Sequence, residues 1–91
     1  MYTNNIVKIE LECDGTAKEV SVGFCPTKVE VIRKDTGHMA TCFKDVAKCV
    51  KMTASAALVN SIVEFDATKI TLKTDSDLNV DSKEVILLCY R

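Results

Sequence analysis

The sequence predicts an all-β protein, a compact antiparallel β-sandwich or barrel of about seven short strands. Apolar and polar residues alternate with period two over several segments, and turn-forming residues separate these segments at short intervals. Only one stretch has apolar residues at helical spacing. Because the chain has 91 residues and no visible linker, we expect a single β-rich structural domain over 1–91.

Residues 5–24 are expected to form a β-hairpin. Apolar residues alternate with charged or small polar residues along 7–13 and again along 20–24. Between these runs, Asp14-Gly15-Thr16 supplies a turn signal. Both segments therefore predict strands with one buried face.

A second hairpin is expected over residues 28–43. Pro26 cannot donate a ladder hydrogen bond, so it separates this hairpin from the first. Val29 and Val31 alternate with charged residues in the first strand, and the turn lies at 34–37. The returning strand is expected over 39–43.

Residues 44–60 are the ambiguous part of the chain. Val46, Cys49 and Val50 recur at helical spacing, and Ala54 to Leu58 are small residues that suit a helix. We expect a long loop here with room for one short helix. Long structured loops in compact domains are often functional or interface segments.

Three further strands are expected, over 61–65 and 69–73 around a turn at Asp66-Ala67, and over 84–90. The last strand is a continuous apolar run, so both of its faces require burial, and one face is a candidate contact with another subunit. Ile32 is apolar where its strand would place a polar residue. The candidate interface residues are Ile32, Val85, Ile86, Leu88 and Tyr90.

Composition argues against nucleic-acid and membrane partners. The 12 basic and 13 acidic residues give a formal charge of -1, which supplies no field to attract phosphate backbones. The longest apolar runs are about five residues, too short to span a bilayer. The N-terminus also lacks a charged region followed by an apolar one, so we expect a soluble, non-secreted product.

The chain has five cysteines, an odd number without a signal peptide, which does not fit a secreted disulfide framework. It has no Cys-x-x-Cys pair and only one histidine, His38, so we expect no metal site and no cofactor. Buried thiols are one interpretation, because free cysteine is among the most buried residue types. The other is that some thiols bond within or between chains. The candidates are Cys13, Cys25, Cys42, Cys49 and Cys89.

Two weak site signals are better explained as structure. Asp75, Asp77, Asn79 and Asp81 are spaced like the start of a calcium loop, but the chain has Val80 and Ile86 where an EF-hand requires glycine and glutamate. Asp and Asn also form turns without an ion. His38 and Cys42 would lie too far apart along a strand to form a nucleophile–base pair. No catalytic residue is expected, and the protein is predicted not to be an enzyme.

Two segments resemble small virion proteins of tailed bacteriophages. The first is Gly-Phe-x-Pro-x-x-Val-x-Val, with Gly23, Phe24, Pro26, Val29 and Val31. The second is the closing corner, with Thr74, Asp75, Asp77, Leu78 and Asn79 before a final apolar strand. They are similar to capsid decoration, or cement, proteins. The family's pattern also has glycines just before Ile70 and near Ser82, where this chain has Lys69 and Ser82-Lys83.

The resemblance implies a non-enzymatic β-rich protein that is made in the host cytoplasm and lies on the capsid surface of the virion. There it would bind the major capsid protein, stabilise the assembled head, and form a homo-oligomer, with a trimer favoured. Cysteines could then bond between subunits after release from the reducing cytosol. The alternatives are another virion component, of the tail or a head fibre, and a small thiol- or metal-dependent binding module.

Overall fold

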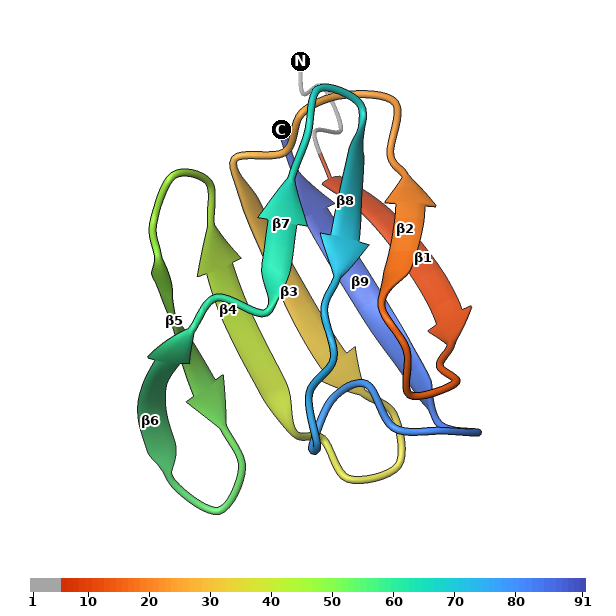
Figure 1. The fold of residues 1–91 in the computed structure, drawn as a ribbon, viewed down its shortest axis with the longest axis vertical. Coiled ribbons are helices and arrows are strands. Elements are labelled where there is room, and N and C mark those ends of the chain that lie inside the picture. The colour runs from red at the N-terminus through yellow and green to blue at the C-terminus, as the bar shows by residue number, and fades with distance from the viewer. Residues whose placement is uncertain (1–5) are drawn as a thin grey trace.

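The computed structural model describes residues 6–91, and every regular element in this range is a β-strand (Figure 1). The nine strands are β1 (Ile6–Glu12), β2 (Lys18–Ser21), β3 (Lys28–Arg33), β4 (Met39–Phe43), β5 (Lys48–Met52), β6 (Ala56–Asn60), β7 (Val63–Phe65), β8 (Lys69–Leu72) and β9 (Glu84–Tyr90). The all-β prediction is confirmed, with two strands more than the expected seven or so.

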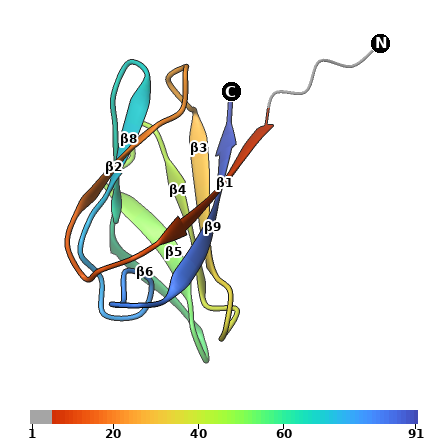
Figure 2. The same ribbon diagram turned by 90° about the vertical axis from the view of Figure 1, so that its right-hand side faces the viewer.

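The strands form two antiparallel sheets that pack face to face as a β-sandwich (Figure 2). The large sheet has the order β1-β9-β3-β4-β5-β6, and the small sheet has the order β2-β8-β7. Both sheets twist in Figure 2, as strands of L-amino acids do. Each sheet therefore has an inner face toward the core and an outer face turned away from it.

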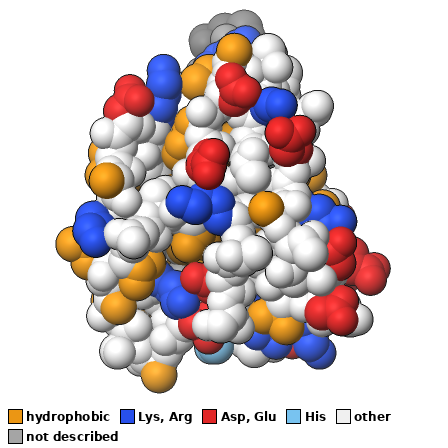
Figure 3. Space-filling view, viewed as in Figure 1, with side chains coloured by type: hydrophobic (Ala, Val, Ile, Leu, Met, Phe, Trp, Pro, Cys, Tyr) orange, Lys and Arg blue, Asp and Glu red, His pale blue; other side chains and the backbone are white. Residues whose placement is uncertain are grey.

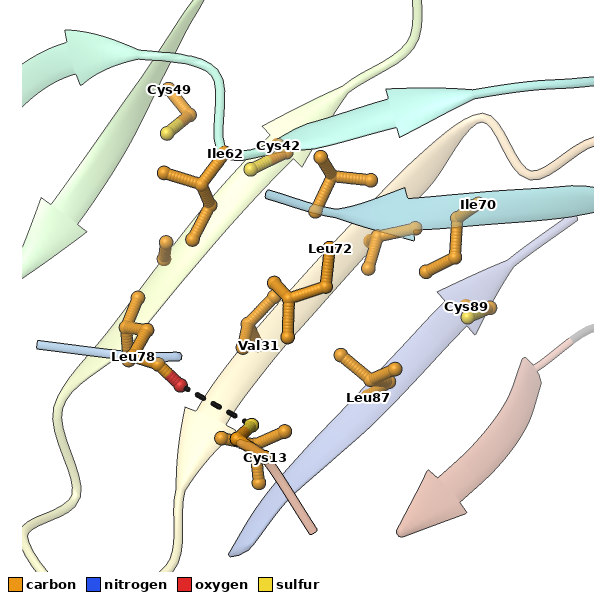
Figure 4. Packing of buried hydrophobic residues seen from close by; sticks show 14 residues of the cluster. Cys13, Val31, Cys42, Cys49, Ile62, Ile70, Leu72, Leu78, Leu87 and Cys89 are labelled. Carbon is orange, nitrogen blue, oxygen red and sulfur yellow. Dashed lines mark hydrogen bonds between the residues drawn. The ribbon is translucent and has the colours of Figure 1, made fainter. Parts of the chain in front are cut away.

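The core lies between the inner faces and is made mostly of β-branched and leucine side chains, with four cysteines among them (Figure 4). Its fully buried members include Val29, Val31, Ile70, Leu72, Leu78, Val85 and Leu87. Leu78 comes from the irregular segment after β8 and fills the space between the sheets at one end. The period-two burial of β3, β8 and β9 puts alternate residues into this core.

The predicted hairpin over 5–24 is wrong, although both of its strands exist. β1 pairs with β9, and β2 pairs with β8 in the other sheet. The turn at Asp14-Gly15-Thr16 therefore carries the chain from one sheet to the other. Gly15 has a φ of 83°, and the Asp14 carboxylate accepts hydrogen bonds from the Thr16 amide and hydroxyl, so the sequence signal for a turn was sound.

Two other predicted pairings are confirmed. β3 pairs with β4 around the turn before Met39, and β7 pairs with β8 around Asp66-Ala67. The last strand is also confirmed at 84–90, and it lies between β1 and β3 near the middle of the large sheet.

The predicted loop and helical turn over 44–60 are wrong, because this segment forms the β5–β6 hairpin. The alternation of β5 is hidden in the sequence because Lys51 occupies an inward position beside Cys49. Its side chain is only 15% exposed and is neutralised by two aspartates from a distant segment. β6 begins with two alanines, which have low strand propensity.

Ser82 adopts a φ of 68° in the turn before β9. This left-handed region favours glycine, because a Cβ atom there crowds the following backbone. The resemblance to decoration proteins led us to expect a glycine near this position. The turn keeps its conformation with serine, and the Ser82 amide donates to the Cys13 carbonyl at 2.9 Å.

Candidate functional site: the outer face of the large sheet

An apolar stripe crosses the outer face of the large sheet. Its residues lie directly opposite one another on five neighbouring strands. The register pairs Ala56 with Met52, Met52 with Met39, Met39 with Ile32, and Ile32 with Ile86. We call this set, Ala56, Met52, Met39, Ile32 and Ile86, the apolar stripe.

A second row beside the stripe is apolar at its β6 end. Leu58 pairs with Val50, and Val50 pairs with Thr41. Leu58 is 70% exposed, and Val50 and Met52 are 44% and 45% exposed. These three side chains form a contiguous exposed apolar patch over β5 and β6, of the kind that marks docking surfaces.

Four of the five predicted interface residues lie on this outer face. Ile32 and Ile86 are in the stripe, and Leu88 and Tyr90 follow Ile86 at alternate positions along β9. All four are half-buried, because neighbouring strands cover only the sides of their side chains. Val85 is different: it is fully buried in the core and is not part of this face.

Charged groups on β1 and β3 border the apolar region. The stripe ends at Glu10, whose carboxylate pairs with Lys34 at 2.8 Å, and this ion pair lowers the pKa of Glu10. Tyr90 donates its hydroxyl to Glu30, and the Lys28 ammonium lies 4.3 Å from the Tyr90 ring centre. An apolar centre with a polar rim is the usual anatomy of a protein–protein interface.

The outer face of the small sheet carries a different surface. Figure 3, which views the molecule from the side of β7 and β8, shows acidic and basic side chains scattered among small apolar groups. Lys69 pairs with Glu19 at 3.1 Å across β8 and β2. No large apolar side chain of the small sheet's strands is among the exposed ones. The two outer faces are therefore chemically distinct.

The acidic corner at residues 75–81 is organised as a turn around a lysine. The Asp75 carboxylate accepts hydrogen bonds from the amides of Asp77 and Leu78, at 2.9 and 3.0 Å. The Lys51 ammonium lies 3.1 Å from Asp75 and 2.6 Å from Asp77, and this contact lowers the pKa of Asp77. Lys51 thus supplies the positive charge that a calcium ion would supply in a metal loop.

Asn79 links this corner to the rest of the sandwich. Its side chain is 4% exposed, and its amide nitrogen donates to the Thr16 carbonyl at 2.8 Å and to the Lys73 carbonyl at 3.1 Å. It therefore joins the β1–β2 connection to the segment after β8. The residues that the resemblance singled out at this corner position the backbone and fill the core.

All five cysteines are free thiols, and four of them, Cys13, Cys42, Cys49 and Cys89, are buried in the core. Burial raises the pKa of Cys42 and of Cys89 to about 11, and the side chain of Cys49 adds to the effect at Cys42. Cys25 is partly exposed, so it is the candidate with access to another chain. That these thiols form disulfides stays a prediction.

Residues 6–91 contain no group of three or more His, Cys, Asp or Glu side chains that could hold a metal ion. A shallow groove of about 690 Å³ lies between the β4–β5 turn and β7, lined in part by Phe43, Val46, Phe65 and Lys73. It is open to solvent, and the Ser61 hydroxyl in its lining donates to the Val63 carbonyl at 3.0 Å. In the same described range, no helix is long and apolar enough to cross a membrane.

Five residues of the apolar region were not among the predicted interface residues: Met39, Val50, Met52, Ala56 and Leu58. Four of them lie on β5 and β6, which were not recognised as strands. The available signal was the pair of methionines at positions 39 and 52, which a hairpin register would place side by side.

Comparisons with known proteins found no matching family model, no matching curated protein and no matching solved structure.

Proposed function

We propose that this protein is a capsid decoration protein of a tailed bacteriophage, which binds the outside of the assembled head through the outer face of its large sheet. The apolar stripe is the observation that carries the proposal. A small β-sandwich whose apolar residues all lay in its core would have a polar outer face. This outer face instead has Met52, Met39, Ile32 and Ile86 in one row.

The arrangement suits binding without chemistry. Shell stabilisation by a decoration protein requires only that the protein bind the assembled form in preference to free subunits. The stripe supplies apolar area that is removed from water on docking, at about 25 cal/mol per Å² covered. Because Ile32, Met39 and Ile86 are half-buried already, each contributes less than a fully exposed side chain would. The charged rim at Glu10, Lys34 and Lys28 then favours one orientation on the shell.

The resemblance to decoration proteins supports the same proposal from the sequence side. The first matching segment contributes Val29 and Val31 to the core, and the second contributes the turn around Asp75 and the buried Leu78 and Asn79. Both segments therefore specify the sandwich itself. The stripe lies on strands β3 to β6 and β9, outside most of the matched positions. We expect the residues that contact the capsid to vary in this way, because the capsid surface differs from one phage to another.

The first test is quantitative mass spectrometry of density-purified particles from the source, giving copies of this chain per copy of the major capsid protein. A ratio of the same order as the shell protein is expected. A few copies per particle would place the chain in the tail or at a vertex, and absence from the particles would refute a virion role.

A binding assay on stripped or undecorated heads tests whether the outer face of the large sheet contacts the head. Ile86→Lys places a charge in the stripe and should weaken head binding by about ten-fold or more, because a charge at a desolvated interface centre is unpaired. Ser21→Lys is the matched control, since Ser21 is exposed on β2 of the small sheet. Equal binding by both variants, with both folded, would exclude the outer face of the large sheet as the contact.

A further inference from the structure

We propose that the open edge of the large sheet at β6 is a docking site for β6 of a second copy of this chain, paired antiparallel about a two-fold axis at Leu58. The proposal does not depend on the decoration function. It concerns a sheet edge rather than a sheet face, and it commits to one partner.

The backbone of β6 directs hydrogen-bonding groups outward from the sheet. β6 is the terminal strand of the large sheet, next to β5 alone. The Ser61 amide donates to the Ala47 carbonyl at 2.8 Å, and these two residues continue the β5–β6 register by one position. Hydrogen-bonded pairs alternate along an antiparallel ladder, so Val59 and Ala57 bond to β5. Ala56 and Leu58 therefore point their N–H and C=O groups at the open edge.

The other edge strands carry the features that block edge pairing. β1, at the opposite edge of the large sheet, has Lys8, Glu10 and Glu12 along its length. In the small sheet, β2 has Lys18 and Glu19, and β7 is only three residues long and contains Glu64. Charged and very short edge strands are common means of preventing sheet extension. β6 has neither, because its sequence Ala-Ala-Leu-Val-Asn contains no charge.

A second copy fits this edge by self-complementarity. With the two-fold axis at Leu58, the two Leu58 residues lie opposite each other, and Ala56 of each copy lies opposite Asn60 of the other. This register forms on the order of four to six backbone hydrogen bonds. It brings no like charges together, which distinguishes β6 from a strand such as β1.

The pairing also explains the exposure of Leu58. Leu58 and Val50 are cross-strand neighbours on the outer face, and Leu58 is 70% exposed in the single chain. In the pair, each Leu58 gains the other as its missing cross-strand neighbour, about 5.5 Å away between Cα atoms. The apolar rows of the two copies then join into one continuous surface. Because the contact is isologous, it closes at two copies, whereas the resemblance to decoration proteins implied three.

Sedimentation velocity of the purified chain tests the proposal. The measurement covers about a hundred-fold range of concentration centred in the tens of micromolar, because a contact between two five-residue strands is small and we expect weak association. Wild type should move from monomer to dimer. Leu58→Lys and Leu58→Glu should each weaken association by about ten-fold or more, because each puts like charges opposite across the axis. An equimolar mixture of the two variants should restore the dimer, because unlike charges then face each other.

Val46→Lys is the matched control. Val46 is 48% exposed in the β4–β5 turn, away from the edge, so this variant should dimerise as wild type does. Circular dichroism and thermal melting establish that each variant is folded. Wild type that stays monomeric at all concentrations overturns the proposal. This holds even if Leu58→Lys weakens binding to heads, because that result would mean that the β6 edge pairs with a strand of another protein and not with a second copy. Failure of the mixture to associate, with both variants folded, overturns the two-fold axis at Leu58.

Discussion

The two faces of β9 have the same kind of side chain and opposite environments. Val85, Leu87 and Cys89 point inward and are fully buried, whereas Ile86, Leu88 and Tyr90 point outward and are only half-buried. A strand in the middle of a sheet has partners on both sides, so its outward residues are covered laterally but not from above. The inner face therefore contributes mainly to folding, and the outer face retains apolar area for a partner.

The largest effect on stability should come from the inner face. Leu87→Ala removes a fully buried side chain and leaves a cavity, so the free energy of unfolding should fall by about 2–5 kcal/mol. Urea denaturation followed by circular dichroism measures this loss. A loss below about 1 kcal/mol would mean that the core collapses around the missing side chain and that the inner face is less important than its burial indicates.

Substitution of Lys51 tests how much a charged side chain at an inward position contributes to stability. Lys51→Met leaves Asp75 and Asp77 without their cation, and we expect a loss of about 2–3 kcal/mol, because a partly buried carboxylate is left unpaired. Lys48→Met on the exposed side of the same strand is the control, and it should cost about 0.5 kcal/mol or less. Equal losses in the two variants would show that the inward ion pair is dispensable.

The five thiols should differ in reactivity, because four are buried on the core side of the sandwich and Cys25 is partly exposed. At pH 8, a maleimide should label Cys25 quickly and the four buried cysteines only after unfolding, as followed by mass spectrometry of the intact chain. Because the folded pKa of Cys42 and Cys89 is raised from 9.0 to about 11, their contribution to stability is complete below pH 9 and is lost as the pH rises toward 11. Rapid labelling of two or more sites in the folded chain would contradict this burial.

The smallest effect on stability should come from the outer face. Leu88→Ala, one residue from Leu87, should lower the free energy of unfolding by about 1 kcal/mol or less, because the side chain is half-exposed before the change. The same urea titration compares the two variants directly. A loss as large as that of Leu87→Ala would mean that something covers the outer face in the free protein.

Local patterns predicted where most strands lie but not how all of them pair. Alternation at 7–13 and 20–24 indicated two strands, and the turn between them was real, yet the strands belong to different sheets. A turn signal specifies that the chain changes direction and does not specify which strand lies beside which. β3–β4 and β7–β8 were predicted correctly because their partners are neighbours in sequence.

The site was predicted only in part for a similar reason. The apolar run of β9 predicted Ile86, Leu88 and Tyr90 as surface candidates, and it also included the buried Val85. A run without alternation does not indicate which of its residues point inward and which point outward. β5 was missed because its inward Lys51 depends on Asp75 and Asp77, residues more than twenty positions away. Without β5 and β6, Val50, Met52 and Leu58 had no place in the predicted outer face.

The position of β9 also sets when the protein can fold. β9 lies between β1 and β3, so the last strand of the described chain pairs with the first. During synthesis, β1 and β3 lack their shared neighbour until β9 leaves the ribosome. Folds dominated by such distant pairings assemble slowly, on a scale of about milliseconds to seconds. Until then both strands expose unpaired edges, and a chain that stops short of β9 keeps them exposed.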